Sequence, residues 1–285
     1  MTAALSAHVD RVVLGFDGSP SGRVAMDVAV GEARRRSVPL LVITAIDDSP
    51  GYPLTLTTRA EAARQSALDG VRTAADALGE EAVYSRVEFG PSAEVLLRRV
   101  RPSDLVVVGS HGHRATGRML LGSTSAAVLS HCPGPVLVVR GDPQYWHGPV
   151  LVGVDGSAHS LAALSFGAEM AAGRAASLRV VMAVPEVVDA GGEVSGPDEP
   201  AIRGAESQLR QYVEAVLGEK AGTDTEMLVV QGHPADVLVH HAAQSQLVVV
   251  GSRGRGTFSS LLLGSVGREV SQRASCPVLV LRPAA

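Results

Sequence analysis

The sequence predicts an α/β protein built from two tandem domains, each an open parallel sheet with helices on both faces. Its 285 residues are enough for two ordinary domains. Short runs rich in Val and Leu alternate with helix-like stretches, which is typical of parallel sheets. A glycine motif, Gly-x2-Gly-x9-Gly-Ser, begins at Gly109 and again at Gly251. Together these observations indicate a duplicated domain.

The repeat extends beyond the glycine motif. Three more segments recur: 15–19 as 153–157, 90–96 as 232–238, and 135–138 as 277–280. The last two keep the offset of 142 residues that separates Gly109 from Gly251, and the first has an offset of 138 residues. A repeat of this length is a whole domain rather than a solenoid unit. We therefore predict domains at residues 1–141 and 149–285, joined by a turn-rich linker at about 142–148.

In the first half, apolar runs predict five strands, because their continuous Val and Leu suit strands covered on both faces. These are Arg11–Phe16, Leu40–Ala45, Ala82–Phe89, Leu105–Val108 and Val136–Arg140. The stretches between them predict helices at Ser21–Arg35, Arg59–Leu78, Ala93–Val100 and Ser123–Leu129. This alternation implies right-handed βαβ units and one open parallel sheet.

The second half repeats the pattern. Its predicted strands are Val150–Val154, Leu178–Val184, Glu226–Val230, Leu247–Val250 and Val278–Leu281. Its predicted helices are His159–Ala172, Pro200–Lys220, Pro234–Ala243 and Ser259–Arg273. Two polar stretches that follow the second strand of each half, Asp47–Thr58 and Pro185–Glu199, are predicted loops.

The glycine motifs suit a phosphate group. Each follows an apolar run and precedes a helix-like stretch, so backbone N–H groups can approach an anion that the helix N-terminus also attracts. In an open α/β sheet the ligand lies beyond the carboxyl ends of the strands, where the strand order reverses. Asp17, Ala45 and the Gly109 loop all follow such ends, so we expect them to converge on one ligand.

Three features of each half resemble the universal stress protein family. They are a first strand that ends in Gly-x-Asp-Gly-Ser, the Gly-x2-Gly-x9-Gly-Ser loop after the fourth strand, and a closing Pro-Val-Leu-Val strand. The resemblance covers nearly the whole chain as two copies of the domain. The chain is similar to tandem members of the family from mycobacteria and other actinobacteria. It implies a Rossmann-like, adenine nucleotide alpha hydrolase-like fold, bound ATP that magnesium can accompany, and a pairing of the two domains along the strands Val136–Arg140 and Val278–Leu281. A further pairing of chains into a homodimer is left open.

Position by position, the resemblance implies two nucleotide sites. In the first, Asp17 contacts the adenosine part, Ala45 meets the adenine through its backbone, and the loop residues Gly109, Gly112, Gly122 and Ser123 hold ribose and phosphates. The second site has Asp155, Ala183, Gly251, Gly254, Gly264 and Ser265 in these roles.

Four of these site residues, two aspartates and two serines, also have a simpler structural interpretation. Asp17 and Asp155 can cap the following helices, and the hydroxyls of Ser123 and Ser265 can do the same. The copies differ where His111 stands opposite Arg253. A histidine titrates near neutrality. If it reaches the phosphates, the first site weakens as pH rises through its pKa, and the alternative is that it points to solvent.

A further pair of differences lies in the nine-residue spacer. His113 stands opposite Arg255, so a second titrating side chain again replaces a permanent charge. Arg114 replaces Gly256, which leaves the shape of the first loop open.

No motif predicts an enzyme. The chain has no P-loop, and its only lysine, Lys220, is distant in sequence from both glycine motifs. It has no Gly-x-Ser-x-Gly elbow and no cysteine–histidine pattern of a zinc site. Cys132 and Cys276 are predicted to be small buried residues rather than redox groups.

We therefore predict a cytoplasmic, nucleotide-dependent stress-response regulator without catalytic or metal-binding residues, whose protein partner is unknown. The alternatives are a slow ATPase or a nucleotidyl- or phosphotransferase on the same fold, and a sensor of cyclic AMP or another adenine nucleotide. A net charge of −4 gives no reason to expect nucleic acid as a partner, and no apolar run is long enough to indicate a membrane span.

Overall fold

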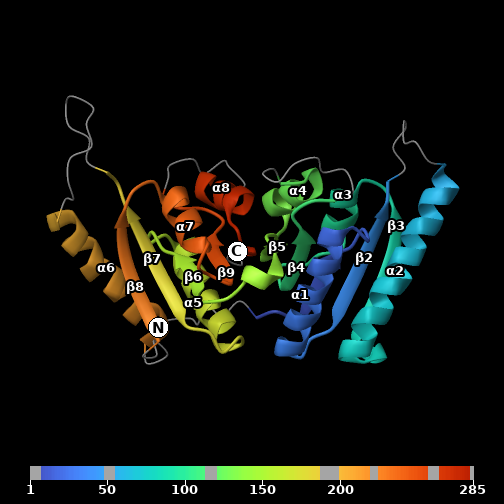
Figure 1. The fold of residues 1–285 in the computed structure, drawn as a ribbon, viewed down its shortest axis with the longest axis horizontal. Coiled ribbons are helices and arrows are strands. Elements are labelled where there is room, and N and C mark those ends of the chain that lie inside the picture. Colours follow the sequence, from blue (N-terminus) through green and yellow to red (C-terminus); the bar gives the residue numbers. More distant parts are fainter. Residues whose placement is uncertain are drawn as a thin grey trace. The chain divides into compact units, whose positions relative to one another are not determined.

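The computed structural model describes residues 8–47, 55–112, 121–186, 199–218, 224–255 and 263–282. The described chain divides into two compact units, one ending at Arg140 and the other beginning at Gly141. Each unit is an α/β domain with helices along its sheet (Figure 1).

The first domain has a parallel sheet in the order β3-β2-β1-β4-β5. Its strands are β1 (Arg11–Gly15), β2 (Leu40–Ile46), β3 (Val83–Phe89), β4 (Asp104–Gly109) and β5 (Val136–Val139). The chain moves outward from β1 to β3 and then returns to place β4 on the other side of β1. The strand order therefore reverses between β1 and β4, which is where such sheets bind ligands.

The helices of this domain cover both faces of the sheet. They are α1 (Pro20–Arg36), α2 (Leu56–Leu78), α3 (Ser92–Leu97) and α4 (Ser123–His131), with a short 3₁₀ turn, η1 (Glu80–Ala82). A side chain at Gly15 would meet Leu96 of α3, whereas the next residue, Phe16, lies against Gly70 of α2. Because successive strand residues point to opposite faces, α2 and α3 lie on opposite sides. The α/β fold with two covered faces is confirmed.

The second domain repeats this architecture in the order β8-β7-β6-β9-β10, again all parallel. Its strands are β6 (Val150–Gly153), β7 (Leu178–Val184), β8 (Thr225–Gln231), β9 (Leu247–Gly251) and β10 (Val278–Leu281). Its helices are α5 (Ala158–Ala172), α6 (Glu199–Leu217), α7 (Pro234–Ala242) and α8 (Ser265–Arg273), with a 3₁₀ turn, η2 (Pro143–Tyr145), near the start. Gly153 lies against Leu238 as Gly15 lies against Leu96. The duplication therefore extends to individual packing contacts.

The central strands form the core, and the edge strands depart from the expectation of cover on both faces. Val12, Val13 and Leu14 of β1 are fully buried. On β3, in contrast, Tyr84 and Phe89 expose about half of their surface, 56% and 49%. Apolar sequence alone does not distinguish a central strand from an edge strand, because the distinction depends on which strands flank it.

The prediction of a helix from Ser259 to Arg273 is wrong at its start. Leu263 and Gly264 are not helical, and α8 begins at Ser265. Gly264 is extended, and its N–H donates to the carbonyl of Ser252 at 2.8 Å, so it belongs to the turn that links the glycine motif to the helix.

Two further predicted boundaries, of one loop and one helix, also shift. The predicted loop Asp47–Thr58 ends earlier, because Thr55 caps α2 by accepting a hydrogen bond from the N–H of Thr58. Lys220, the predicted end of α6, lies outside the described residues, and the helix ends at Leu217. Cys132 and Cys276 are both buried, as predicted.

Candidate functional site

A cavity of about 660 Å³ lies beyond the carboxyl ends of β1, β2 and β4 in the first domain. The six residues that the sequence places in the first site all line it: Asp17, Ala45, Gly109, Gly112, Gly122 and Ser123. Helix α2 contributes further wall residues, Arg59, Ala62, Ala63 and Ser66. The topology thus brings together residues more than a hundred positions apart, although their role in binding stays a prediction.

Asp17 shapes the turn at the end of β1 without capping the next helix. Its Oδ1 accepts a hydrogen bond from the N–H of Ser19 at 2.9 Å. The cap of α1 is Ser19, whose hydroxyl accepts from the N–H of Gly22 at 3.0 Å. Gly18 between them has a φ of +77°, a conformation that glycine adopts without strain. The interpretation of Asp17 as the helix cap is therefore wrong.

The corresponding turn of the second domain has the same hydrogen bonds. The N–H of Ser157 donates to Asp155 Oδ1 at 2.9 Å, and the hydroxyl of Ser157 caps α5 by accepting from Ser160 at 3.2 Å. Gly156 has a φ of +80°. Asp155 is therefore not the helix cap either.

The glycine motif lies directly against the aspartate of each site. A side chain at Gly112 would lie 2.9 Å from Asp17 Oδ2, and one at Gly254 would lie 2.6 Å from Asp155 Oδ2. In the second domain the loop also donates to this carboxylate, because the N–H of Arg255 is 2.9 Å from Asp155 Oδ2. Glycine therefore allows the close approach of two motifs that are distant in sequence.

Both motifs end in a helix N-terminus whose N-cap residue is a glycine and so has no side chain to act as a cap. The N-cap residues are Gly122 for α4 and Gly264 for α8. Ser123 and Ser265 are the first residues of their helices, and they are exposed rather than acting as caps. First-turn N–H groups without a side-chain acceptor, together with the helix dipole, form a site for an anion such as phosphate.

The two sites differ beside the glycine motif. His111 lines the first cavity and is partly buried, so it does not simply point to solvent. Its Nδ1 shares a hydrogen bond of 2.9 Å with the hydroxyl of Ser110, and its Nε2 is buried without a partner among the described residues. Arg253, in the matching position of the second domain, is exposed. His113 and Arg114 lie outside the described residues.

The second site contains a histidine that the sequence analysis did not single out. His159 follows the Asp-Gly-Ser turn, and a side chain at Gly251 would lie 2.9 Å from its Cβ. Burial and the nearby charges of Arg253 and Arg282 lower the pKa of His159 below its ordinary value of 6.5, although Asp155 opposes them. Alignment of the repeats could have found it, because the matching residue in the first domain is Ser21.

Asp155 is the acid-sensitive group of the second site. Burial alone would raise its pKa, but hydrogen bonds from Ser157, Ser160 and the Arg255 N–H outweigh burial and lower it below the ordinary 3.8. A carboxyl with a depressed folded-state pKa stabilises the fold above its unfolded-state value, and this contribution is lost as pH falls through the folded-state value.

We expect Asp155→Asn to reduce the acid sensitivity of folding. Between pH about 6 and about 3, the free energy of unfolding should fall further in the wild type than in the variant. Urea unfolding at both pH values measures this difference. Equal losses in the two proteins would contradict the assignment of the depressed pKa to Asp155.

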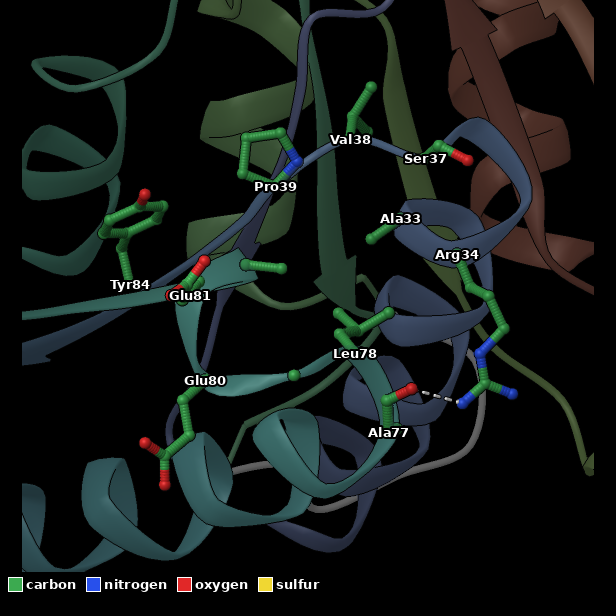
Figure 2. Close-up of a pocket in the computed structure, with 12 residues that line it drawn as sticks. Ala33, Arg34, Ser37, Val38, Pro39, Ala77, Leu78, Glu80, Glu81 and Tyr84 are labelled. Carbon is green, nitrogen blue, oxygen red and sulfur yellow. Dashed lines mark hydrogen bonds between the residues drawn. The ribbon is translucent and has the colours of Figure 1, made fainter.

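A second cavity, of about 820 Å³, lies at the other end of the first domain, between the ends of α1 and α2 and the starts of β2 and β3. Figure 2 shows its wall, where Arg34 reaches across to donate to the carbonyl of Ala77 at 2.7 Å. Glu80, Glu81 and Tyr84 on its rim are exposed. None of its residues has a buried polar side-chain atom that lacks a partner within the described chain. This cavity is larger, but its chemistry does not indicate a ligand.

Within the described ranges, no cluster of three or more His, Cys, Asp or Glu side chains is arranged to hold a metal ion. None of the described helices has both the length and the apolar character that a membrane crossing requires.

Comparison with known proteins identifies the family. The model of the universal stress protein family matches twice, at residues 8–140 and 147–282. A universal stress protein of Mycolicibacterium smegmatis is 34% identical over 293 residues, covering 95% of this chain and 97% of its own. One from Mycobacterium tuberculosis is 32% identical over 286 residues, covering 95% and 96%.

A solved structure shows the same fold. The universal stress protein from Archaeoglobus fulgidus has a TM-score of 0.68, with 18% identity, and the match covers 98% of each chain. The two family matches, the mycobacterial relatives and the shared fold all extend over nearly the whole sequence. The chain therefore belongs to the universal stress protein family, as a tandem member with two copies of the domain.

Proposed function

We propose that each domain binds one adenine nucleotide, ATP, and that the protein is a nucleotide-dependent regulator of a stress response. The observation that carries this proposal is the cavity in which all six predicted residues of the first site meet. Its volume of about 660 Å³ lies in the range of small-molecule sites. In this proposal, the N-terminus of α4 binds the phosphates of the nucleotide, and the carboxyl end of β2 binds its base.

Occupancy of the sites can be transmitted to the surface. Asp47 and Gly112, which follow β2 and β4, both line the cavity. A ligand that contacts both residues favours one conformational state of the protein, and so changes a surface available to a partner. We assign no catalytic residue, because the site carboxylates serve the turns: Asp17 accepts from the Ser19 N–H and Asp155 from the Ser157 N–H.

The nucleotide that copurifies with the full chain tests this proposal. The protein is denatured, and the released nucleotide is identified by chromatography and counted per chain. ATP at both sites supports the proposal. Cyclic AMP or AMP would instead indicate a sensor of another adenine nucleotide. ADP that accumulates over many turnovers of added ATP would indicate an enzyme, with magnesium as the added metal in that assay.

We also expect ATP to raise the pKa of His159. An anion beside an imidazole favours its protonated form, and ATP phosphates in the second site would add negative charge near His159. The affinity for ATP should then rise as pH falls through the interval in which His159 titrates. NMR titration of the histidines with and without ATP measures the shift.

His241 is the internal control for this titration. Its pKa is also lowered, by burial and by the charges of Arg179 and His240, but it lies on α7 away from the glycine motif. The pKa of His241 should stay unchanged when ATP binds. An equal shift of both histidines, or none at His159, would contradict the placement of the phosphates.

Three further expectations also stay predictions. They are the pairing of the domains through Val136–Arg140 and Val278–Leu281, the linker at 142–148, and a cytoplasmic location.

A further inference from the structure

The first cavity contains a buried hydroxyl that none of the contacts above explains. Thr44 of β2 lines the cavity and is only 2% exposed. Its Oγ1 has no hydrogen-bond partner among the described residues. Buried polar groups in folded proteins are almost always paired, so an unpaired hydroxyl in the wall of a cavity indicates a partner supplied by the ligand.

The strand register shows which way Thr44 points. Ile43 lies beside Gly15, whose side-chain position faces Leu96 of α3. Thr44 is the next residue, so its side chain faces the opposite side of the sheet, where α2 packs. The part of the cavity wall that α2 contributes contains three small residues, Ala62, Ala63 and Ser66, together with Arg59. Small side chains opposite Thr44 leave room for a flat ring.

Thr44 and His111 lie at opposite ends of the cavity. Thr44 is on β2 and His111 follows β4, with β1 between them. Two strand spacings amount to about 10 Å. The buried Nε2 of His111 is another polar atom of this cavity without a described partner. A ligand that satisfies both atoms must present polar groups at both ends, as a nucleotide does with its base and its phosphate.

The second domain differs at this end. Met182 follows Val181, which lies beside Gly153, so it takes the place of Thr44, and it is buried at 5% exposure. A side chain at Gly156 would meet the hydroxyl of Tyr212, whereas one at Gly18 would meet Ser66. The second site therefore has a thioether in place of the hydroxyl on the strand, and a larger side chain on the covering helix.

We propose that the Thr44 hydroxyl hydrogen-bonds a polar edge atom of the base in the first site, and that the second site binds the base without this contact. Thr44 is then a specificity-determining residue that makes the two sites unequal. This inference rests on the proposed nucleotide binding.

Calorimetric titration of the full chain with ATP, fitted to two sites, tests the inference. Thr44→Val keeps the shape and removes the hydroxyl, and it should weaken one site about tenfold while the other is unchanged. Thr44→Ser should retain most of the affinity. Met182→Leu, the matched control in the second domain, should leave the first site unaltered.

ATP analogues that each lack one polar edge group of the base locate the contact. The purine riboside, 1-deaza, 3-deaza and 7-deaza triphosphates are titrated against the wild type and Thr44→Val. For one analogue, the wild type and Thr44→Val should bind with equal affinity in the first site, because that analogue already lacks the group that the hydroxyl contacts. An equal loss with ATP and all four analogues would place the hydroxyl on the sugar or phosphates and overturn the inference.

The remaining outcomes separate this inference from the proposed function. Wild-type binding that Thr44→Val leaves unchanged would refute only the role of Thr44. A wild-type protein that binds no ATP at either site would refute nucleotide binding itself. An unchanged second site in Thr44→Val shows that the variant is folded.

Discussion

Gly251→Val is expected to reduce the ATP bound per chain by about half, because it blocks the approach of phosphate to one of two glycine motifs. A Cβ at Gly251 would lie 2.7 Å from the carbonyl carbon and 2.9 Å from the carbonyl oxygen of His159, so the start of α5 would have to shift. Gly109→Val should have the same effect on the first site, where a Cβ would lie 2.7 Å from the hydroxyl of Ser21. The nucleotide released on denaturation, counted per chain, measures both effects.

A smaller substitution separates loss of binding from loss of folding. A Cβ at Gly254 would approach only the carboxylate of Asp155, and one at Gly112 only that of Asp17. Gly254→Ala and Gly112→Ala should therefore lower the bound ATP without displacing a helix. If the four glycine variants all retained the wild-type stoichiometry, the glycine motifs would not be the nucleotide sites.

Arg11→Ala is expected to lower the free energy of unfolding of the first domain by about 3 kcal/mol, because it leaves a buried carboxylate without its cation. Asp104 is 1% exposed, and Arg11 donates to it through Nε at 3.2 Å and Nη2 at 2.5 Å. Arg11 also donates to the carbonyl of Arg99 at 3.1 Å. Urea unfolding monitored by circular dichroism measures the loss.

Arg179→Ala is the matched control. Arg179 of β7 pairs with Glu226 of β8 at 2.6 Å, but the Glu226 side chain is 49% exposed. Solvated pairs of this kind contribute little, so the variant should lose less than about 1 kcal/mol. A loss for Arg11→Ala as small as that for Arg179→Ala would contradict the importance of burial for this pair.

The fold was predictable because its signals are local and repeated. The apolar runs of β1, β4 and their copies had no other interpretation once the glycine motifs fixed the repeat. The meeting of Asp17 and Gly109 in one cavity could be predicted, because the carboxyl ends of neighbouring parallel strands lie at one edge of the sheet. The predicted start of α8 at Ser259 overlooked the repeat, in which Ser265 matches Ser123, the first residue of α4.

The tandem architecture, the family and the six positions that meet in the first cavity could all be predicted from the order of residues in the chain. The folded chain was needed to show that Ser19, rather than Asp17, caps α1, and that His111 lines the cavity. It also showed that Thr44 lines the same cavity as the small residues of α2, and that His159 lies beside Gly251. Strand and helix patterns are set by neighbours in the chain, whereas the partner of a polar side chain comes from segments that only folding brings close.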